Sequence, residues 1–131
     1  MRNSALLLLL LIPFACSKDI TISMNSISGI WILTQVSGGI TGTMPMPSGI
    51  NTIAFESSGK YSKAVDNVTQ ESGMYTITLK KTIFSEKKMN VIHFIPSQNN
   101  SYDMVVDLNG NILSLMQNAY DGINCVYSKH K

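Results

Sequence analysis

The sequence predicts an all-β fold, a small eight-stranded antiparallel up-and-down β-barrel. Most of the chain consists of short segments in which apolar and polar residues alternate, the period of a strand with one buried face. Short turns rich in Gly and Asn separate these segments, and Asn109-Gly110 is the strongest two-residue hairpin signal. The chain also lacks an amphipathic helical stretch of useful length. An eight-stranded barrel closes both edges of its sheet, which protects a small domain from strand-to-strand aggregation.

The first 15 residues are predicted to be a signal peptide and not part of this domain. Arg2 precedes an unbroken apolar run, Ala5–Ile12, which is too short to span a bilayer as a stable helix. The small residue Ala15 followed by Cys16 resembles the lipobox of bacterial lipoproteins, although Pro13 stands where that pattern has an aliphatic residue. The resemblance implies that Cys16 becomes the first mature residue and carries acyl chains such as palmitate.

Two acyl chains make a stable membrane anchor where one is marginal, so the expected partner of Cys16 is a membrane surface. Cys125 is then left as a lone thiol that packs as a small hydrophobe. The alternative is an ordinary secretory signal, after which Cys16 and Cys125 could form a disulfide in an oxidising compartment. Ser17-Lys18-Asp19 is similar to the signal that sends some Bacteroidota lipoproteins to the cell surface. The expected location is the bacterial cell envelope, as an outer-membrane lipoprotein facing the periplasm or the surface.

Residues 16–27 are expected to form the lipidated N-terminus and a tether, and residues 28–131 the barrel. The first strand is expected at 29–37, with Trp31 on one face and Ile30, Ile32 and Val36 on the other. Because both faces are apolar, at least the first half of this strand is expected to be covered on both faces. The remaining strands are expected at 50–56, from residue 60 onward, and at 74–80, 90–95, 101–108, 111–117 and 123–129, with polar turns or loops at 66–73 and 85–89.

The segment 38–48 contains three Gly and two Pro, so it cannot be a regular helix. It lacks the Gly-Lys-Ser/Thr ending of a phosphate-binding loop. A plain surface connection is the favoured interpretation of this segment, and a mobile lid over a cavity mouth, carrying Met44 and Met46, is the alternative.

No catalytic, metal or cofactor site is predicted. Lys+Arg 10 against Asp+Glu 8 gives a net charge of +2, too small for a nucleic-acid-binding surface. His93 lies in mid-strand and is expected to be hydrogen-bonded or partly exposed, and not a metal ligand. Asp103 and Asp107 share one face of a strand whose other face is apolar, so they are expected on its solvated side. An enzyme is therefore not expected.

The chain from about Ser28 to Lys129 resembles the lipocalin-like lipoproteins common in Bacteroidota. The matching pieces are Gly29-x-Trp31, Phe55 with Gly59-Lys60-Tyr61, Glu71-Ser72-Gly73-Met74-Tyr75-Thr76-Ile77, Leu113-x-Leu115, and Asp121-Gly122 with Tyr127. The resemblance implies a barrel that holds a small apolar ligand, with Trp31 at its closed end. It also implies that Lys129 lies over Trp31, in the place where true lipocalins have a basic residue on the last strand.

Two functions remain open. The first is a membrane-anchored carrier or sensor of a small apolar ligand, whose candidate binding residues are the inward-facing Phe55, Tyr75, Ile77, Tyr102, Met104 and Leu115. The second is an interaction or structural lipoprotein of the envelope whose barrel is filled by its own side chains. A cavity of a few hundred Å³ favours the carrier, and a filled interior favours the structural protein.

Overall fold

A computed structural model describes residues 21–39 and 42–131, which form one short helix and eight strands. The elements are α1 (Met24–Ile27), β1 (Gly29–Gly38), β2 (Asn51–Phe55), β3 (Lys60–Val65), β4 (Val68–Thr82), β5 (Ser85–Pro96), β6 (Tyr102–Asn109), β7 (Ile112–Met116) and β8 (Ile123–Lys129).

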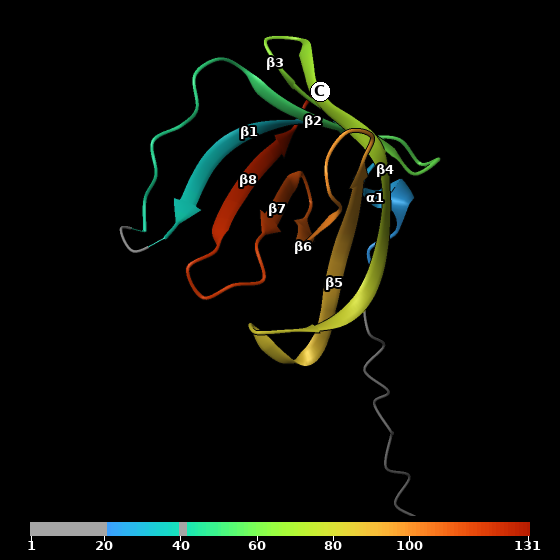
Figure 1. Ribbon diagram of the computed structural model, residues 1–131, viewed down its shortest axis with the longest axis vertical. Coiled ribbons are helices and arrows are strands. Elements are labelled where there is room, and N and C mark those ends of the chain that lie inside the picture. Colours follow the sequence, from blue (N-terminus) through green and yellow to red (C-terminus); the bar gives the residue numbers. More distant parts are fainter. Residues whose placement is uncertain (1–20, 40–41) are drawn as a thin grey trace, which may run out of the picture.

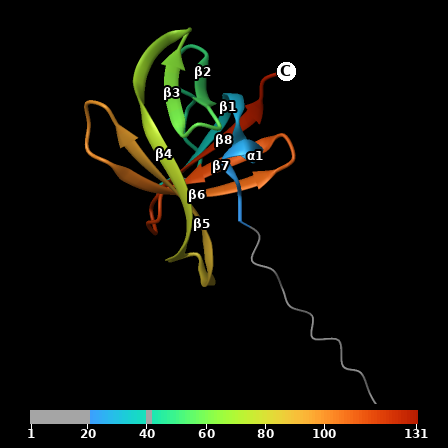
Figure 2. The same ribbon diagram turned by 90° about the vertical axis from the view of Figure 1, so that its right-hand side faces the viewer.

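The eight strands form a closed barrel in which every strand pairs antiparallel with its neighbours in sequence (Figure 1). The last strand, β8, returns to pair with β1 and closes the sheet. The predicted fold class, an all-β eight-stranded antiparallel up-and-down barrel, is confirmed. The view in Figure 2 shows the long β4–β5 hairpin projecting beyond the rest of the barrel.

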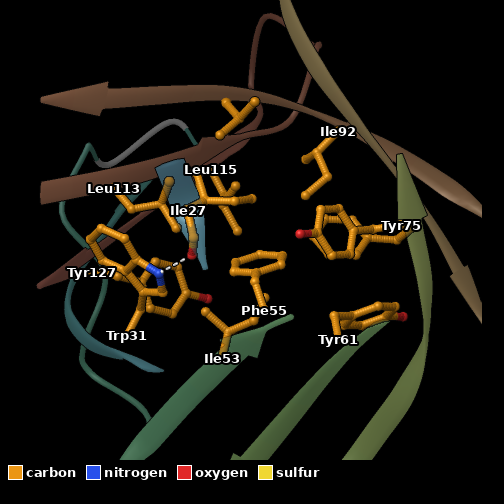
Figure 3. Packing of buried hydrophobic residues seen from close by; sticks show 12 residues of the cluster. Ile27, Trp31, Ile53, Phe55, Tyr61, Tyr75, Ile92, Leu113, Leu115 and Tyr127 are labelled. Carbon is orange, nitrogen blue, oxygen red and sulfur yellow. Dashed lines mark hydrogen bonds between the residues drawn. The ribbon is translucent and has the colours of Figure 1, made fainter. Parts of the chain in front are cut away.

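One end of the barrel is closed by α1 and the start of β1. Ile27 and Trp31 are both fully buried, and the indole Nε1 of Trp31 donates a hydrogen bond to the Ile27 carbonyl (Figure 3). The Nζ atom of Lys129 lies 5.3 Å from the centre of the Trp31 ring, a cation–π arrangement. Gly29 has a φ of +126°, and a Cβ at this position would lie 3.2 Å from Cε of Lys129. Glycine therefore allows both the turn into β1 and the placement of the lysine.

Residues 21–27, predicted to be part of a tether, pack against the barrel instead. Ser23 caps α1 through its side chain, and Ile27 belongs to the hydrophobic core. The backbone N–H of Ile22 donates to Oδ1 of Asn90 on β5. The predicted signal peptide and the predicted lipidation at Cys16 lie outside the described residues. Within 21–39 and 42–131, no helix is both long and apolar enough to cross a membrane.

Strands β4 and β5 are longer than predicted. The predicted turn over 66–73 is only the pair Asp66-Asn67, whose positive φ angles of 49° and 65° are typical of a tight hairpin. The predicted loop over 85–89 is the first part of β5. Both segments are polar, so they lack the apolar alternation that marks a strand in the sequence. Pairing with a neighbouring strand, and not burial, keeps them extended.

A bulge in β1 changes which residues of that strand face the interior. The pairing with β8 shifts between Leu33 and Gln35, and beyond the shift Val36 pairs with the inward-facing Cys125. Val36 is therefore buried on the same side as Trp31, and not on the opposite side as predicted. Ile30 is 48 % exposed, so the expectation that both faces of this strand are covered is wrong there.

The hairpin between β6 and β7 turns one residue later than the sequence suggested. Asn109 pairs with Ile112, so the two loop residues are Gly110 and Asn111. Of these two, only Gly110 has a positive φ. This is the pattern of a turn with glycine first, and not the predicted turn with positive φ at Asn109 and Gly110.

Candidate functional site

The half of the barrel nearest α1 is filled with side chains. Two of the six candidate ligand-binding residues, Phe55 and Tyr75, belong to the core cluster, and a third, Ile77, packs against it. The rings of Phe55 and Tyr75 pack edge to face with centres 5.0 Å apart, and both residues are buried (Figure 3). The Tyr75 hydroxyl donates to the backbone carbonyl of Glu56. These residues belong to the core and do not line the cavity described next.

A cavity of about 350 Å³ lies at the other end of the barrel. Its walls come mainly from the start of β6, the end of β7 and the first residues of β8, and they include the other three candidates, Tyr102, Met104 and Leu115. The full lining is Lys63, Tyr102, Asp103, Met104, Leu115, Gln117, Ile123, Cys125 and Tyr127. A cavity of this size is within the range of small-molecule sites.

A polar cluster lies inside the barrel wall beside this cavity. The hydroxyls of Tyr61 and Tyr102 both donate to Oε1 of Glu71, at 2.8 and 2.7 Å. The ammonium of Lys63 donates to the Tyr102 hydroxyl at 2.6 Å and lies 3.6 Å from the same carboxylate oxygen. The cluster therefore joins β3, β4 and β6 across the interior.

Burial and hydrogen bonding set the protonation states in this cluster. Burial alone would raise the pKa of Glu71, but the two tyrosine hydroxyls and the charge of Lys63 outweigh burial and lower it. Burial, followed by the interactions with Glu71, raises the pKa values of Tyr61 and Tyr102. At neutral pH the carboxylate is ionised and both tyrosines are neutral hydrogen-bond donors.

Lys63 is the group in this cluster best placed to recognise a ligand. Its Nζ atom lies 5.1 Å from the centre of the Phe94 ring and 5.0 Å from that of Tyr102, so aromatic faces support the cation on two sides. An ammonium has three N–H donors, of which one binds Tyr102 and a second faces Glu71. The remaining donor suits an acceptor oxygen of a molecule in the cavity, whose apolar part would contact Met104, Leu115 and Ile123.

Cys125 also lines the cavity, as does Tyr127. Burial raises the pKa of its thiol. A protonated thiol is a poor nucleophile, so the geometry favours packing over reactivity here.

His93 and Asp103 lie opposite each other on the outer face of the barrel. Nδ1 of His93 hydrogen-bonds to Asp103, whose carboxylate also accepts from Lys80 at 3.0 Å. The hydrogen bond with His93 and the pair with Lys80 lower the pKa of Asp103. As predicted, His93 is a hydrogen-bonded strand histidine. Within the described part of the chain, no three His, Cys, Asp or Glu side chains are grouped as a metal site would require.

The loop between β1 and β2 does not line the cavity in the ranges that the structure describes. Its residues Met44 and Met46 are absent from the lining, and Met46 is exposed. The backbone N–H of Met44 donates to the Val36 carbonyl, which holds this part of the loop against β1. The position fits a surface connection better than a lid.

Sequence reasoning missed Lys63 and Glu71. The sequence did contain a signal, because strand side chains alternate with period two. Lys63 lies two residues after the inward-facing Tyr61, and Glu71 lies two residues before Gly73, which is also on the inward face. Their polarity concealed this, since a charged residue is expected to face solvent unless a partner is known.

Comparisons with protein-family models, with curated proteins and with solved structures find no match to this chain.

Proposed function

We propose that this protein is an exported, lipid-anchored binding protein of the lipocalin-like type. Its barrel holds a small molecule with an apolar body and one hydrogen-bond-accepting end. Cys16 carries the acyl anchor, and the domain is held at a membrane of the bacterial envelope.

The cavity of about 350 Å³ is the observation that carries this proposal. It supports a carrier over a structural lipoprotein with a filled barrel, because a filled barrel would leave no such space beside a charged group. Lys63, with a third donor besides those that face Tyr102 and Glu71, supplies a polar contact against apolar walls. This combination is typical of small-molecule sites. The closed end formed by Ile27 and Trp31, with Lys129 over the indole, supports the resemblance to lipocalin-like domains.

Native mass spectrometry tests the proposal directly. The full chain is expressed with its own signal in a bacterial host, extracted from membranes in detergent, and examined for a bound small molecule. We expect a species heavier than the acylated chain by the mass of one ligand.

A matched pair of variants then locates the binding site. Met104→Asp places a charge in the cavity wall, whereas Met74→Asp places the same change on an exposed position of β4. With an environment-sensitive apolar dye, we expect saturable binding to the wild type and to Met74→Asp, and loss of binding in Met104→Asp. Absence of dye binding and of any co-purified molecule in the folded wild type would favour the filled structural lipoprotein.

A further inference from the structure

The tip of the β4–β5 hairpin exposes two large apolar residues away from the core. Ile83 is 41 % exposed and Phe84 is 45 % exposed. In both ribbon views the hairpin projects below the body of the barrel (Figures 1 and 2). Exposed apolar residues gathered at a projecting tip are typical of a surface that contacts another phase or partner.

Two hydrogen bonds support the backbone of the tip. The backbone N–H of Ile83 donates to Oδ1 of Asn118 in the β7–β8 loop at 2.9 Å, and that of Phe84 donates to the Thr82 hydroxyl. On the same loop as Asn118, Tyr120 is 93 % exposed. Tyrosine is among the residues enriched at the boundary between membrane and water.

Positive charge surrounds this tip. Residues 80–88 contain four of the ten basic residues of the chain and one of its eight acidic residues, a net charge of +3. The rest of the chain has six basic and seven acidic residues, a net charge of −1. All four lysines are exposed, and Lys80 is paired with Asp103. Apolar side chains flanked by lysines match the chemistry of an anionic lipid surface, which attracts cations and accepts apolar groups.

The start of the described chain lies on the same side of the barrel as the hairpin tip. The backbone N–H of Ile22 donates to the side chain of Asn90 on β5. Asn90 is five residues from Ser85, the first residue of β5, so these two residues are about 17 Å apart along the strand. Cys16 is six residues before Ile22, so the proposed anchor lies at most about 21 Å from that contact. In both ribbon views the start of the described chain lies below α1 and above the hairpin tip. An anchor on so short a connection keeps the hairpin within reach of the bilayer.

We propose that the β4–β5 hairpin tip is a membrane-docking surface, in which Ile83 and Phe84 enter the interface of an anionic phospholipid bilayer while Lys81, Lys87 and Lys88 bind its headgroups. The argument from tether length rests on the proposed anchor at Cys16. The apolar tip and the charge around it do not.

Contact quenching in vesicles tests this proposal. The full chain, expressed with its signal and purified from membranes, is reconstituted into vesicles of phosphatidylcholine and phosphatidylglycerol in equal amounts, with acyl chains brominated near the glycerol. Bromine quenches tryptophan fluorescence only on contact. In the Phe84→Trp variant we expect the added fluorescence to fall by about half or more relative to unbrominated vesicles, as for a side chain in the interface.

The matched control lies at the end of β4 that is far from the hairpin tip. Val68 is 63 % exposed at the start of β4, fourteen strand residues from Thr82. In Val68→Trp we expect no quenching beyond that of Trp31, which is common to both variants. Adding Lys81→Gln, Lys87→Gln and Lys88→Gln to Phe84→Trp is expected to reduce the quenching, and so is raising the salt concentration. Equal quenching at positions 84 and 68, or none at position 84, would overturn the docking surface.

A second measurement on the wild type avoids any risk that a variant misfolds. Amine-reactive labelling followed by peptide mass spectrometry should show Lys81, Lys87 and Lys88 protected in anionic vesicles relative to detergent, while the exposed Lys60 labels equally in both. Equal labelling of all four lysines in the two media would count against the proposal. The mass of the N-terminal peptide reports acylation in the same experiment. Protection of the lysines without acylation would support the docking surface and contradict the anchor at Cys16. Acylation without protection would support the anchor and contradict the docking surface.

Discussion

The indole of Trp31 donates a 2.7 Å hydrogen bond to the backbone carbonyl of Ile27, four residues earlier in the chain. This bond joins the first strand to the helix that covers the end of the barrel. It satisfies the one polar atom of the tryptophan side chain, so the ring can be fully buried at no cost in lost hydrogen bonding.

Replacing Trp31 should therefore destabilise the whole barrel. We expect Trp31→Ala to lower the free energy of unfolding by about 3–5 kcal/mol, the usual effect of removing a large buried aromatic side chain. Trp31→Phe keeps most of the apolar volume but leaves the Ile27 carbonyl without its donor, and should cost about 1–3 kcal/mol. Urea unfolding followed by circular dichroism measures both. A change below about 1 kcal/mol in Trp31→Ala would contradict the packing described here.

Acylation is expected at Cys16 and not at Cys125. In bacteria supplied with labelled palmitate, the wild type and Cys125→Ser should carry label and partition into detergent, and Cys16→Ser should do neither. The two substitutions remove the same group, so the comparison separates the proposed anchor at Cys16 from the partly buried thiol of Cys125. Unlabelled wild-type protein in the aqueous phase would show that the lipobox resemblance is misleading.

The stability of the protein should depend on pH through Glu71. Its pKa in the folded protein is lower than its ordinary value of 4.5. The ionised carboxylate therefore stabilises the fold fully above that ordinary value, and this contribution is lost as the pH falls through the folded-state pKa. Glu71→Gln should lower the free energy of unfolding at neutral pH by about 1–3 kcal/mol and flatten the acid limb of the stability profile.

Asp103→Asn is the matched control for that experiment. The pKa of Asp103 is also lowered. The ionised carboxylate of Asp103 therefore stabilises the fold as well, and this stabilisation is also lost as the pH falls. Its carboxylate is more exposed than that of Glu71, and solvent screens its pairs with His93 and Lys80. We expect a smaller loss of stability at neutral pH than in Glu71→Gln. An equal or larger effect at Asp103 would show that the interior cluster contributes little.

The loop between β1 and β2 should not affect binding in the cavity. Because Met44 and Met46 do not line it, Met44→Asp is expected to bind an apolar dye with the affinity of the wild type. Dye titration checks this, with Met104→Asp as the variant in which binding is lost. Weakened dye binding in Met44→Asp would contradict this expectation and would support the hypothesis that the loop is a lid over the cavity.

The apolar pattern of the sequence was sufficient to predict the barrel and most of its strands. Tyr75 and Ile77 alternate with threonines, and this period places them on the core face where the structure has them. The strand at Ile123–Lys129 was predicted with its observed bounds. These features depend on local sequence alone, because one buried face and one wet face leave a period-two pattern.

The missed features depend on contacts between distant residues. The bulge that turns Val36 inward arises from the pairing of β1 with β8, nearly ninety residues away along the chain. Lys63 and Glu71 face the interior because two tyrosines from separate strands satisfy them. Three of the six residues predicted to bind a ligand line the cavity. The alternation of apolar and polar residues identifies which side chains face the interior. It does not show which part of the interior is filled and which part is a cavity.

The closed end of the barrel, where Ile27 and Trp31 are buried, limits how a molecule could enter and leave the cavity. A molecule in the cavity has no exit past these two residues, so it leaves by the route through which it entered. If the proposed ligand occupies the cavity, the barrel can store and release it but cannot pass it through from one end to the other. A donor and an acceptor of that ligand would then have to use the same opening in turn.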